Sequence, residues 1–365
     1  MYEDLIFKIA LTQIPQVGPV HARTLINAFQ TSADIFKAPV KQLEKIEGIG
    51  SIRARNIKHF QHFARCEKEA KFIVKHEIHP LFISDQSYPS RLLHCADAPI
   101  LLFYKGTCDV QPKRILSVVG TRSPTTYGKQ QCENIISQLP ENVLIVSGLA
   151  MGIDTIAHHC ALKSGKQTIG IMAHGHDRIY PYENKKLANQ MLSQGGLLTE
   201  FTSGSIPDRE NFPKRNRIIA GMCDAILVIE TGIKGGSMIS ADLANGYNRD
   251  VFALPGRTLD AKSEGCNQLI KQNKAQLICH ADDILNAMNW DEKKVSRKTI
   301  QKELFVTLSE DEKLIREYLL EEEKHIDQLR PPGLTPGKVA ALLLTLELNG
   351  MVEVLPGKIY RWNIT

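Results

Sequence analysis

The sequence predicts a protein built around an α/β domain with a doubly wound, mostly parallel, extended Rossmann-like sheet. Between about 95 and 289, apolar runs rich in β-branched residues recur, and helix-length amphipathic segments such as 153–164 and 237–248 separate most of them. Continuous apolar runs are typical of parallel strands buried on both faces. The runs are PILLFYKG, RILSVVGT, NVLIVSGL, QTIGIMA, GLLTE, AILVIE, VFALPG and AQLI.

Composition narrows the class of protein. The 365 residues include 45 Lys plus Arg and 40 Asp plus Glu, and this net charge of +5 favours a polyanionic partner only weakly over an unremarkable surface.

The eight cysteines form no CxxC pair, and several lie in apolar runs, as Cys279 does, so we expect reduced core cysteines. Without a basic leader or an apolar run near the ~20 residues that span a bilayer, a cytoplasmic protein is expected.

Residues 1–80 predict a helical domain of the helix-hairpin-helix or sterile-alpha-motif-like type. Segments 14–29 and 46–60 each place an apolar-x-Gly turn before a helix with basic positions. Such a turn exposes N–H groups to which a nucleic-acid phosphate binds, which makes Gly18, Gly48 and Gly50 candidate phosphate contacts. A docking domain with the same shape is an equally good interpretation.

Two segments follow the central domain, which we place at 81–290. Residues 291–304 form a charged, poorly apolar linker, and 305–365 predict a winged helix whose first helix begins after Ser309 as N-cap. The second helix, expected at 335–348, has Lys338 as its only basic residue. This favours protein docking over DNA reading for the winged helix.

Glycine-rich turns follow the expected strands and should meet at one edge of the sheet. Glycines there allow backbone N–H groups to approach phosphate closely, so a phosphate-lined groove is expected. GxGxxG and GxxxxGK[ST] are both absent from the sequence, which disfavours a dinucleotide cofactor or an ATPase. We expect no cofactor. The turns are 119–124, 147–154, 173–181, 199–205, 230–241 and 254–257.

A basic segment with an aromatic residue in its midst, IPDRENFPKRNRIIAG, covers 206–221. Guanidinium groups suit phosphates, and an aromatic face suits an unstacked base, so the segment indicates single-stranded nucleic acid. The alternative is a solvated helix start, with Phe212 in the core and Arg217 paired to a sheet carboxylate such as Glu230. Arg215 and Arg217 are two residues apart and cannot share a helix face, so one should face the groove while the other braces the fold.

Two other classes of function remain open. ETGIKGGSMIS resembles the glycine-rich loop of nucleoside-monophosphate phosphoribohydrolases, and Glu230 or Glu200 would then be the acid/base of a nucleotide hydrolase. The other class is a pure protein–protein adaptor without DNA affinity. No GxSxG or HExxH motif is present, and we expect no metal site at His174 and His176.

Seven blocks resemble the DNA-processing protein A family (DprA, also called Smf) in order and spacing across about 95 to 280. They are SVVGTRSPTTYG, IVSGLAMGIDTIAH, HDRIYPYENKKL, LLTEF, NFPKRNRIIAGMCDAILVIET, KGGSMISADLA and RDVFALPG. The resemblance implies a non-catalytic, homodimeric single-stranded DNA-binding protein of natural transformation. It would protect incoming DNA, displace single-strand-binding protein and load the RecA recombinase.

The resemblance also implies site residues. The family's Gly-x-Arg arginine is Arg122, its basic and aromatic pair is Arg209 and Phe212, and its Gly-Ser loop is Gly236 and Ser237. Tyr182 stands where many members have lysine, so Lys185 or Lys186 substitutes for it, or Tyr182 stacks on a base. Met151 replaces a frequent arginine, and His174 and His176 alter a usual GxGxD loop. The full set of expected DNA contacts is Gly120, Thr121, Arg122, Gly148, Lys185, Arg209, Phe212, Lys214, Arg215, Asn216, Gly235, Gly236 and Ser237.

Overall fold

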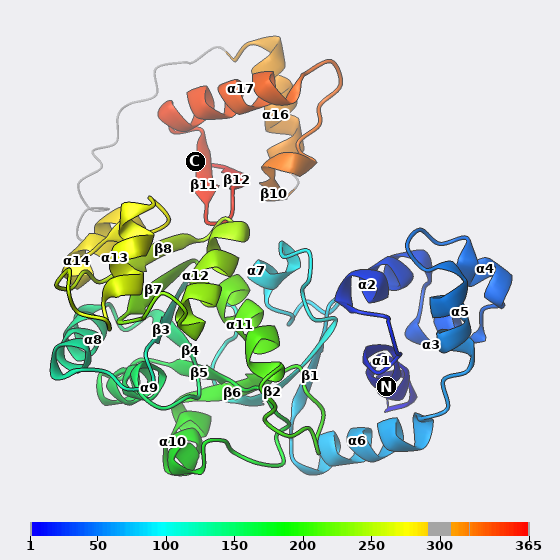
Figure 1. Cartoon of the computed structure of the whole chain (residues 1–365). Helices are drawn as coiled ribbons and strands as arrows, with labels where there is room; N and C mark the ends of the chain where they lie inside the picture. Colours follow the sequence, from blue (N-terminus) through cyan, green and yellow to red (C-terminus); the bar gives the residue numbers. More distant parts are fainter. Residues whose placement is uncertain (1, 291–307, 321, 364–365) are drawn as a thin grey trace.

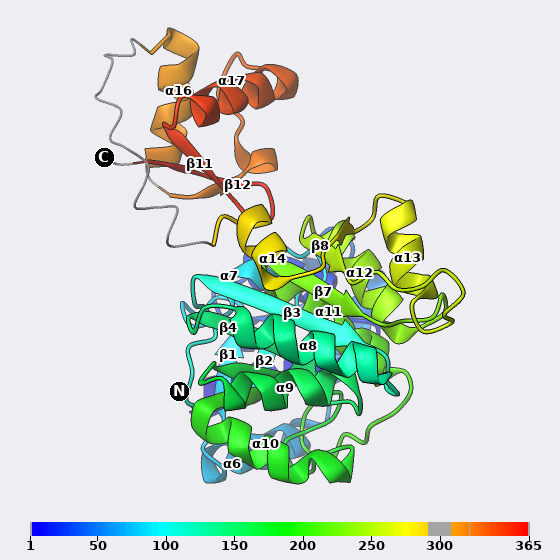
Figure 2. The same ribbon diagram turned by 90° about the vertical axis from the view of Figure 1, so that its left-hand side faces the viewer.

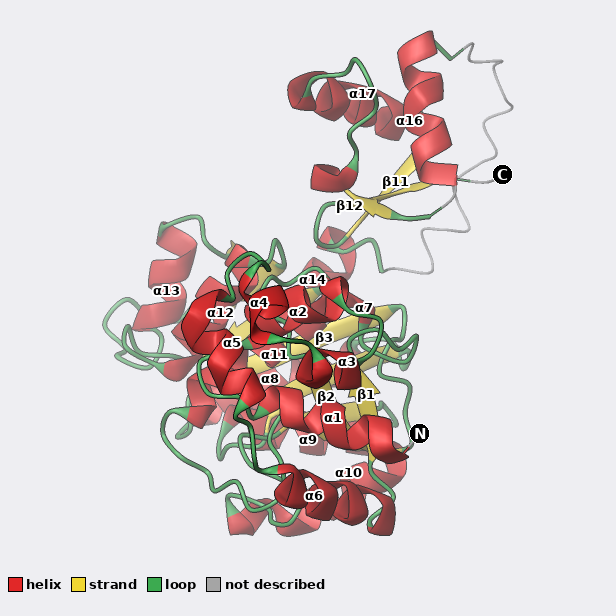
Figure 3. Cartoon of the chain, turned by 90° about the vertical axis from the view of Figure 1, so that its right-hand side faces the viewer, coloured by secondary structure: helices red, strands yellow, loops and turns green. Residues whose placement is uncertain are grey.

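The computed structural model describes residues 2–290, 308–320 and 322–363. Six helices come first and form a separate body beside the central sheet (Figures 1 and 3). Pro19 occupies the first position of α2 and Thr31 caps α3, which are sequence features that start helices. The helices are α1 (Tyr2–Thr12), α2 (Pro19–Ala28), α3 (Ser32–Lys37), α4 (Val40–Glu44), α5 (Gly50–Lys58) and α6 (Phe63–Lys75).

The central sheet has nine strands in the order β1-β2-β6-β5-β4-β3-β7-β8-β9. The seven strands from β6 to β9 in this order pair in parallel, and β1 and β2 extend one edge antiparallel. Strand β1 is not among the apolar runs predicted from the sequence. The strands are β1 (His79–Phe82), β2 (Leu101–Gly106), β3 (Arg114–Gly120), β4 (Val143–Gly148), β5 (Thr168–Ile171), β6 (Gly195–Thr199), β7 (Ala225–Ile229), β8 (Asp250–Ala253) and β9 (Gln276–Leu277).

Helices cover both faces of this sheet. Helices α8, α9 and α10 lie on one face, and α11 and α12 lie on the other (Figure 2). The side chains of β3 alternate between the two faces of the sheet. Leu116 and Val118 pack into a first core with α8 and α9, and Ile115 and Val119 pack into a second core with α11 and α12. The helices are α7 (Ser90–Leu93), α8 (Thr126–Gln138), α9 (Ile153–Lys163), η1 (Tyr182–Asn184), α10 (Lys185–Gln194), α11 (Asn211–Met222), α12 (Gly236–Gly246), α13 (Glu264–Lys271) and α14 (Ala281–Ala287).

The N-terminal helices share the second core with the sheet, so the two bodies are packed together. Leu25 and Ile35 belong to the same buried cluster as Val119. A polar contact adds to this. The buried Glu69 carboxylate on α6 accepts hydrogen bonds from the backbone N–H of Ser203, at 2.8 Å, and from its hydroxyl. The N-terminal helices thereby hold the loop between β6 and α11.

The C-terminal part is a winged helix that lies at one end of the molecule (Figure 1). As expected, Ser309 caps the first helix by accepting a hydrogen bond from the backbone N–H of Glu312. The backbone carbonyl of Pro356, in the wing turn, accepts a hydrogen bond from Arg249 at 3.4 Å. The expected linker, 291–304, lies outside the described residues. The elements are α16 (Glu310–Leu320), β10 (Lys324–His325), η2 (Ile326–Gln328), α17 (Pro336–Leu348), β11 (Val352–Leu355) and β12 (Ile359–Trp362).

The predicted fold class is therefore confirmed: a mostly parallel, doubly wound sheet with an N-terminal helical domain and a C-terminal winged helix. The cysteine prediction needs one correction. Seven of the eight cysteines are buried free thiols, but Cys279 is exposed, because only two residues of the apolar run before it form the short edge strand β9.

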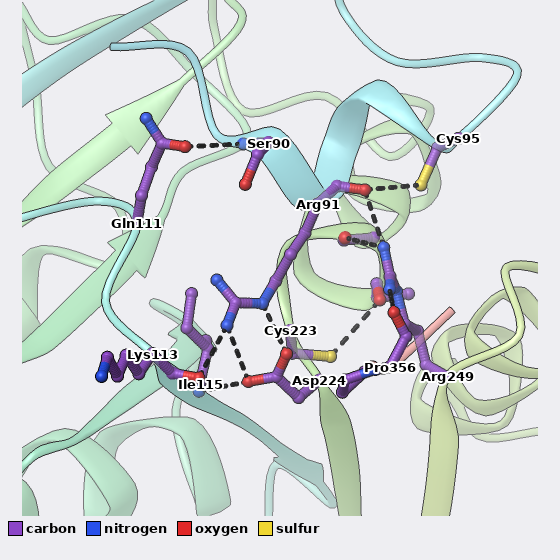
Figure 4. Close-up of polar contacts among 12 residues, drawn as sticks. Ser90, Arg91, Cys95, Gln111, Lys113, Ile115, Cys223, Asp224, Arg249 and Pro356 are labelled. Atoms are coloured by element: carbon purple, nitrogen blue, oxygen red, sulfur yellow. Dashed lines mark hydrogen bonds and ion pairs between the residues drawn. The ribbon is translucent and has the colours of Figure 1, made fainter. Parts of the chain in front are cut away.

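Asp224 joins three elements at the amino-terminal side of the sheet (Figure 4). Its carboxylate accepts hydrogen bonds from the backbone N–H of Ile115 at 2.7 Å and from Arg91 Nε at 2.5 Å, while the residue is 2% exposed. Arg91 is on α7, Ile115 is on β3, and Asp224 directly precedes β7. The carboxylate therefore satisfies a buried donor as well as forming an ion pair.

We expect Asp224→Ala to lower the free energy of unfolding by about 3 kcal/mol, because removal of one partner leaves the buried donors unpaired. Thermal and urea unfolding of the full chain would measure it. The control is Asp242→Ala, which breaks the exposed pair of Asp242 with Lys274 and should change stability by at most about 0.5 kcal/mol. Equal effects of the two variants would contradict the structural role of Asp224.

Candidate nucleic-acid interface

A cavity lined mainly by strand-end loops and two helices lies where the strand order reverses. After β3 the chain builds β4, β5 and β6 on one side, then returns to place β7 on the other side of β3. Gly120 ends β3 and pairs with Ile229 at the end of β7; a Cβ on Gly120 would stand 2.0 Å from the Ile229 carbonyl oxygen. The loops after these two strands form walls of a cavity of about 570 Å³. This is where open α/β sheets bind ligands.

The charge of the cavity is mainly positive. Four cationic side chains line it together with one carboxylate, that of Asp154. Arg122 and Arg209 are exposed, and the Arg122 guanidinium lies 5.3 Å from the centre of the Phe212 ring. The cavity can therefore hold a polyanion and present a flat aromatic face beside it. The four cations are Arg122, Arg209, Arg215 and Lys234.

Arg215 forms the buried floor of the cavity. It is only 5% exposed, its Nη1 donates to the Ile171 carbonyl at 2.5 Å, and its Nε has no hydrogen-bond partner among the described residues. A Cβ at Gly148 would lie 2.3 Å from Arg215 Nη1 and 2.4 Å from Asp154 Oδ2, so glycine is required there. Burial raises the pKa of the Asp154 carboxyl and lowers the pKa of Arg215, and the attraction between them opposes both shifts.

The N-terminus of α12 faces the same cavity. Gly235 is its N-cap residue and supplies no side-chain hydrogen bond, so the first N–H groups of the helix have no such cap. Gly235 and Gly236 differ in their surroundings. A Cβ on Gly235 would meet Thr231 Oγ1 at 2.2 Å, whereas a Cβ on Gly236 would have no atom within 4 Å. Gly235 is therefore required by packing, while no described residue blocks a Cβ on Gly236.

The structure brings together ten of the thirteen expected DNA contacts around this cavity. Three do not line it. Gly148 lies beneath the Arg215 guanidinium, Lys214 is exposed outside the cavity, and Lys185 stacks its ammonium 5.4 Å from the Tyr182 ring centre. The ten are Gly120, Thr121, Arg122, Arg209, Phe212, Arg215, Asn216, Gly235, Gly236 and Ser237. The turn glycines Gly18, Gly48 and Gly50 belong to the N-terminal helices and do not line it either.

Lys234 lines the cavity but was not among the expected DNA contacts. The sequence could have predicted this contact, because Lys234 is a basic residue within the glycine-rich loop ETGIKGGSMIS. The expectation that the glycine turns converge was too broad: residues of 173–181, 199–205 and 254–257 do not line the cavity, although part of 173–181 lines a smaller recess beside it. Those turns instead contact other parts of the chain, as Ser203 does with Glu69 and Pro255 with the Tyr127 hydroxyl.

Arg217 does pair with a carboxylate at the end of a strand, but Glu230, the residue suggested for it, was wrong. Arg217 forms its ion pair with Glu200 and donates to the Asp97 carbonyl, so it braces α11 against the sheet. Glu230 follows β7 and accepts hydrogen bonds from the Thr125 backbone N–H, at 2.8 Å, and hydroxyl. It thereby anchors the start of α8.

The histidines have structural partners. Ring nitrogens of His158 lie 2.6 Å from the Gly148 carbonyl oxygen and 2.7 Å from the Thr168 hydroxyl, and burial lowers its pKa to about 4. His174 contacts the Gly175 carbonyl and His176 the Phe103 carbonyl. In the described ranges no group of three or more His, Cys, Asp or Glu side chains is arranged to hold a metal ion.

None of the helices described for this chain has the length and hydropathy required to span a membrane.

Three family models match successive parts of the chain. DNA recombination-mediator protein A matches residues 79–289, a SAM-like helix-hairpin-helix tandem matches 8–59, and the DprA winged helix domain matches 306–358. Among curated proteins, DNA processing protein DprA of Streptococcus pneumoniae is 42% identical over 203 residues, which cover 56% of this chain and 72% of that protein. Protein Smf of Synechocystis is 35% identical over 295 residues, 77% of this chain and 71% of the relative.

Solved structures agree with these matches. The crystal structure of DNA processing protein A from Streptococcus pneumoniae superposes with a TM-score of 0.67 at 33% identity, covering 78% of this chain and 96% of that one. The Helicobacter pylori protein, solved in a study of its single-stranded DNA binding mode, gives 0.54 at 30% identity over 59% of this chain and 97% of its own. By its sequence, its three domains and its structure, the chain belongs to the DNA recombination-mediator protein A (DprA/Smf) family.

Proposed function

We propose that this protein binds single-stranded DNA in the cavity between the loops that follow β3 and β7, and that it does so without catalysis. The observation that carries the proposal is the cluster of four cations against one carboxylate, beside the Phe212 ring and the N-terminus of α12. Phosphates would bind the guanidinium groups and the helix N–H groups, and an unstacked base would contact the ring. A relative studied for its single-stranded DNA binding mode supports this.

The cellular role follows from the family. We propose that the protein acts in natural transformation as a cytoplasmic homodimer, protecting incoming single strands, displacing single-strand-binding protein and loading RecA. The winged helix fits a protein-docking role better than a DNA-reading role, because Lys338, the one base of α17, lies 2.6 Å from Asp311 in an ion pair. The relatives named DNA processing protein DprA support this role.

The competing hydrolase hypothesis has less support. Its two candidate carboxylates do not line the cavity: Glu230 is bonded to Thr125 and Glu200 to Arg217. Incubation with nucleoside monophosphates tests it directly, since release of free base would show a hydrolase. The adaptor hypothesis would instead require that the full chain has no affinity for an oligothymidylate in fluorescence anisotropy.

For Arg122→Ala we expect weaker binding of a 20-residue oligothymidylate and a salt dependence reduced by about 0.7 units of log K per log salt, the value for one phosphate contact. Fluorescence anisotropy over a salt series measures both. The control is Arg65→Ala, which removes an exposed arginine on α6 outside the cavity. If Arg122→Ala leaves affinity and slope unchanged, Arg122 does not contact the DNA.

Gly236→Ala tests whether a phosphate approaches the N-terminus of α12, because the substitution leaves the packing of the free protein unchanged. The added methyl has open space in the free protein, so the melting temperature should not fall, yet the methyl would obstruct a phosphate approaching the helix N–H groups. We expect about a tenfold loss of affinity for the oligothymidylate. Gly246→Ala, at the other end of α12 and equally open, should bind as the wild type does. Undiminished binding by Gly236→Ala would show that no phosphate approaches α12.

A further inference from the structure

Two exposed tyrosines continue the aromatic surface beyond the cavity. Tyr180 and Tyr182, in the loop before α10, are 48% and 72% exposed. The Tyr180 ring centre lies 6.2 Å from that of Phe212, whose other neighbour is the Arg122 guanidinium. Lys185 places its ammonium over Tyr182. Three rings and two cations thus lead from the cavity to the start of α10.

A small recess connects these rings with the cavity. It has a volume of about 70 Å³, and Tyr180, Pro181 and Met151 are among the residues that line it. Arg122, Phe212 and Arg215 line both the recess and the larger cavity, so the two are adjacent. A strand that leaves the cavity over Phe212 meets Tyr180 next.

The loop that carries the rings is fixed at both ends. The Tyr180 N–H donates to Nε2 of the buried His174 at 3.2 Å, and His174 Nδ1 lies 2.9 Å from the Gly175 carbonyl oxygen. Both contacts are satisfied together in the neutral histidine, and burial lowers its pKa. At the other end the Asn184 amide donates to the Leu149 carbonyl at 2.9 Å. The backbone that carries the rings is therefore held in place at both ends.

The fold itself does not require these rings to be exposed. Neither tyrosine hydroxyl forms a hydrogen bond within the described part of the chain. A single exposed apolar side chain is common, but a row of rings beside a basic cavity, with cations over two of them, is how proteins stack the bases of a single strand.

We propose that Tyr180 and Tyr182 form a second base-stacking platform that extends the single-stranded DNA path from Phe212 to α10, with Lys185 beside it to neutralise a phosphate. The proposal rests on the proposed function. Duplex DNA cannot use this platform, because its bases are already stacked on each other. The platform therefore adds affinity for single strands specifically.

The test uses the full chain with Tyr180→Ala, Tyr182→Ala and the double variant. The probes are a labelled 20-residue oligothymidylate and an oligomer of equal length in which abasic sites replace the bases. Stacking needs the base but not the phosphate, so each single variant should lose about tenfold in affinity for the oligothymidylate while the salt slope stays that of the wild type. On the abasic oligomer the variants and the wild type should bind alike.

Two controls identify the ring as the cause. Tyr180→Phe and Tyr182→Phe keep the ring and should retain wild-type affinity. Tyr127→Ala removes a tyrosine that is 44% exposed on α8 and lines neither the cavity nor the recess, and it should also bind normally. If an alanine variant folds poorly, Tyr180→Trp replaces it: its fluorescence should be quenched by the oligothymidylate and not by the abasic oligomer.

The outcomes separate the two proposals. Failure of the wild-type protein to bind the oligothymidylate would overturn the proposed function itself. Wild-type binding that depends on Arg122, together with alanine variants that bind normally, would overturn the platform alone. Equal losses by these variants on the oligothymidylate and on the abasic oligomer would also overturn it, because the rings would then not be contacting bases.

Discussion

The geometry of the candidate interface depends on the reversal of strand order at β3 and on the carboxylate that holds the two diverging loops together there. Glu230 follows β7 directly, and its carboxylate accepts hydrogen bonds from the backbone N–H and the hydroxyl of Thr125 at the start of α8. The loop from Gly120 to Thr125 is consequently tied to β7 at its far end and to β3 at its near end. Arg122 lies in the middle of this loop. Its position over the Phe212 ring therefore depends on the hydrogen bonds between Thr125 and Glu230, in which Arg122 takes no part.

The arginines of α11 divide between recognition and support because of the helical period. Arg215 and Arg217 lie on different sides of the helix: Arg215 points to the cavity floor, and Arg217 points to Glu200 and the Asp97 carbonyl. A buried guanidinium is costly unless it is compensated, and within the part of the chain that the structure describes Arg215 has the Ile171 carbonyl and the nearby Asp154 carboxylate as partners. Its unpartnered Nε leaves part of that cost for an anionic ligand to offset. This gives a physical reason for an anion to enter the cavity deeply.

Much of the fold was predictable because parallel strands buried on both faces leave apolar runs that the local sequence displays. Six of the candidate contacts, in 119–124 and 230–241, were predictable for a related reason: strand-end loops meet at one edge of such a sheet. The other four, in 206–221, were predictable from the basic and aromatic composition of that segment. What was missed depends on contacts between distant residues. The predicted partner of Arg217 was the wrong carboxylate, because the sequence does not show that Glu230 turns toward Thr125. The antiparallel strand β1 was missed because it is a short edge strand, and Tyr180 because its ring could equally have been packed inside. Lys234, by contrast, could have been found from its glycine-rich loop.

The placement of the carboxylates explains why the same loops suit an intact polymer better than a bond to be cleaved. Acid/base catalysis needs a carboxyl group within hydrogen-bond reach of the reacting atoms. Glu230 is occupied by Thr125 and Glu200 by Arg217, and Asp154 lies beside the Arg215 guanidinium. Each of these acidic groups therefore stabilises the protein or a cation. Besides the Asp154 carboxylate, the cavity is lined by guanidinium, ammonium, hydroxyl and amide groups and by one aromatic ring. The cationic groups and the ring are suited to phosphate and base, as the proposed binding of an intact strand requires.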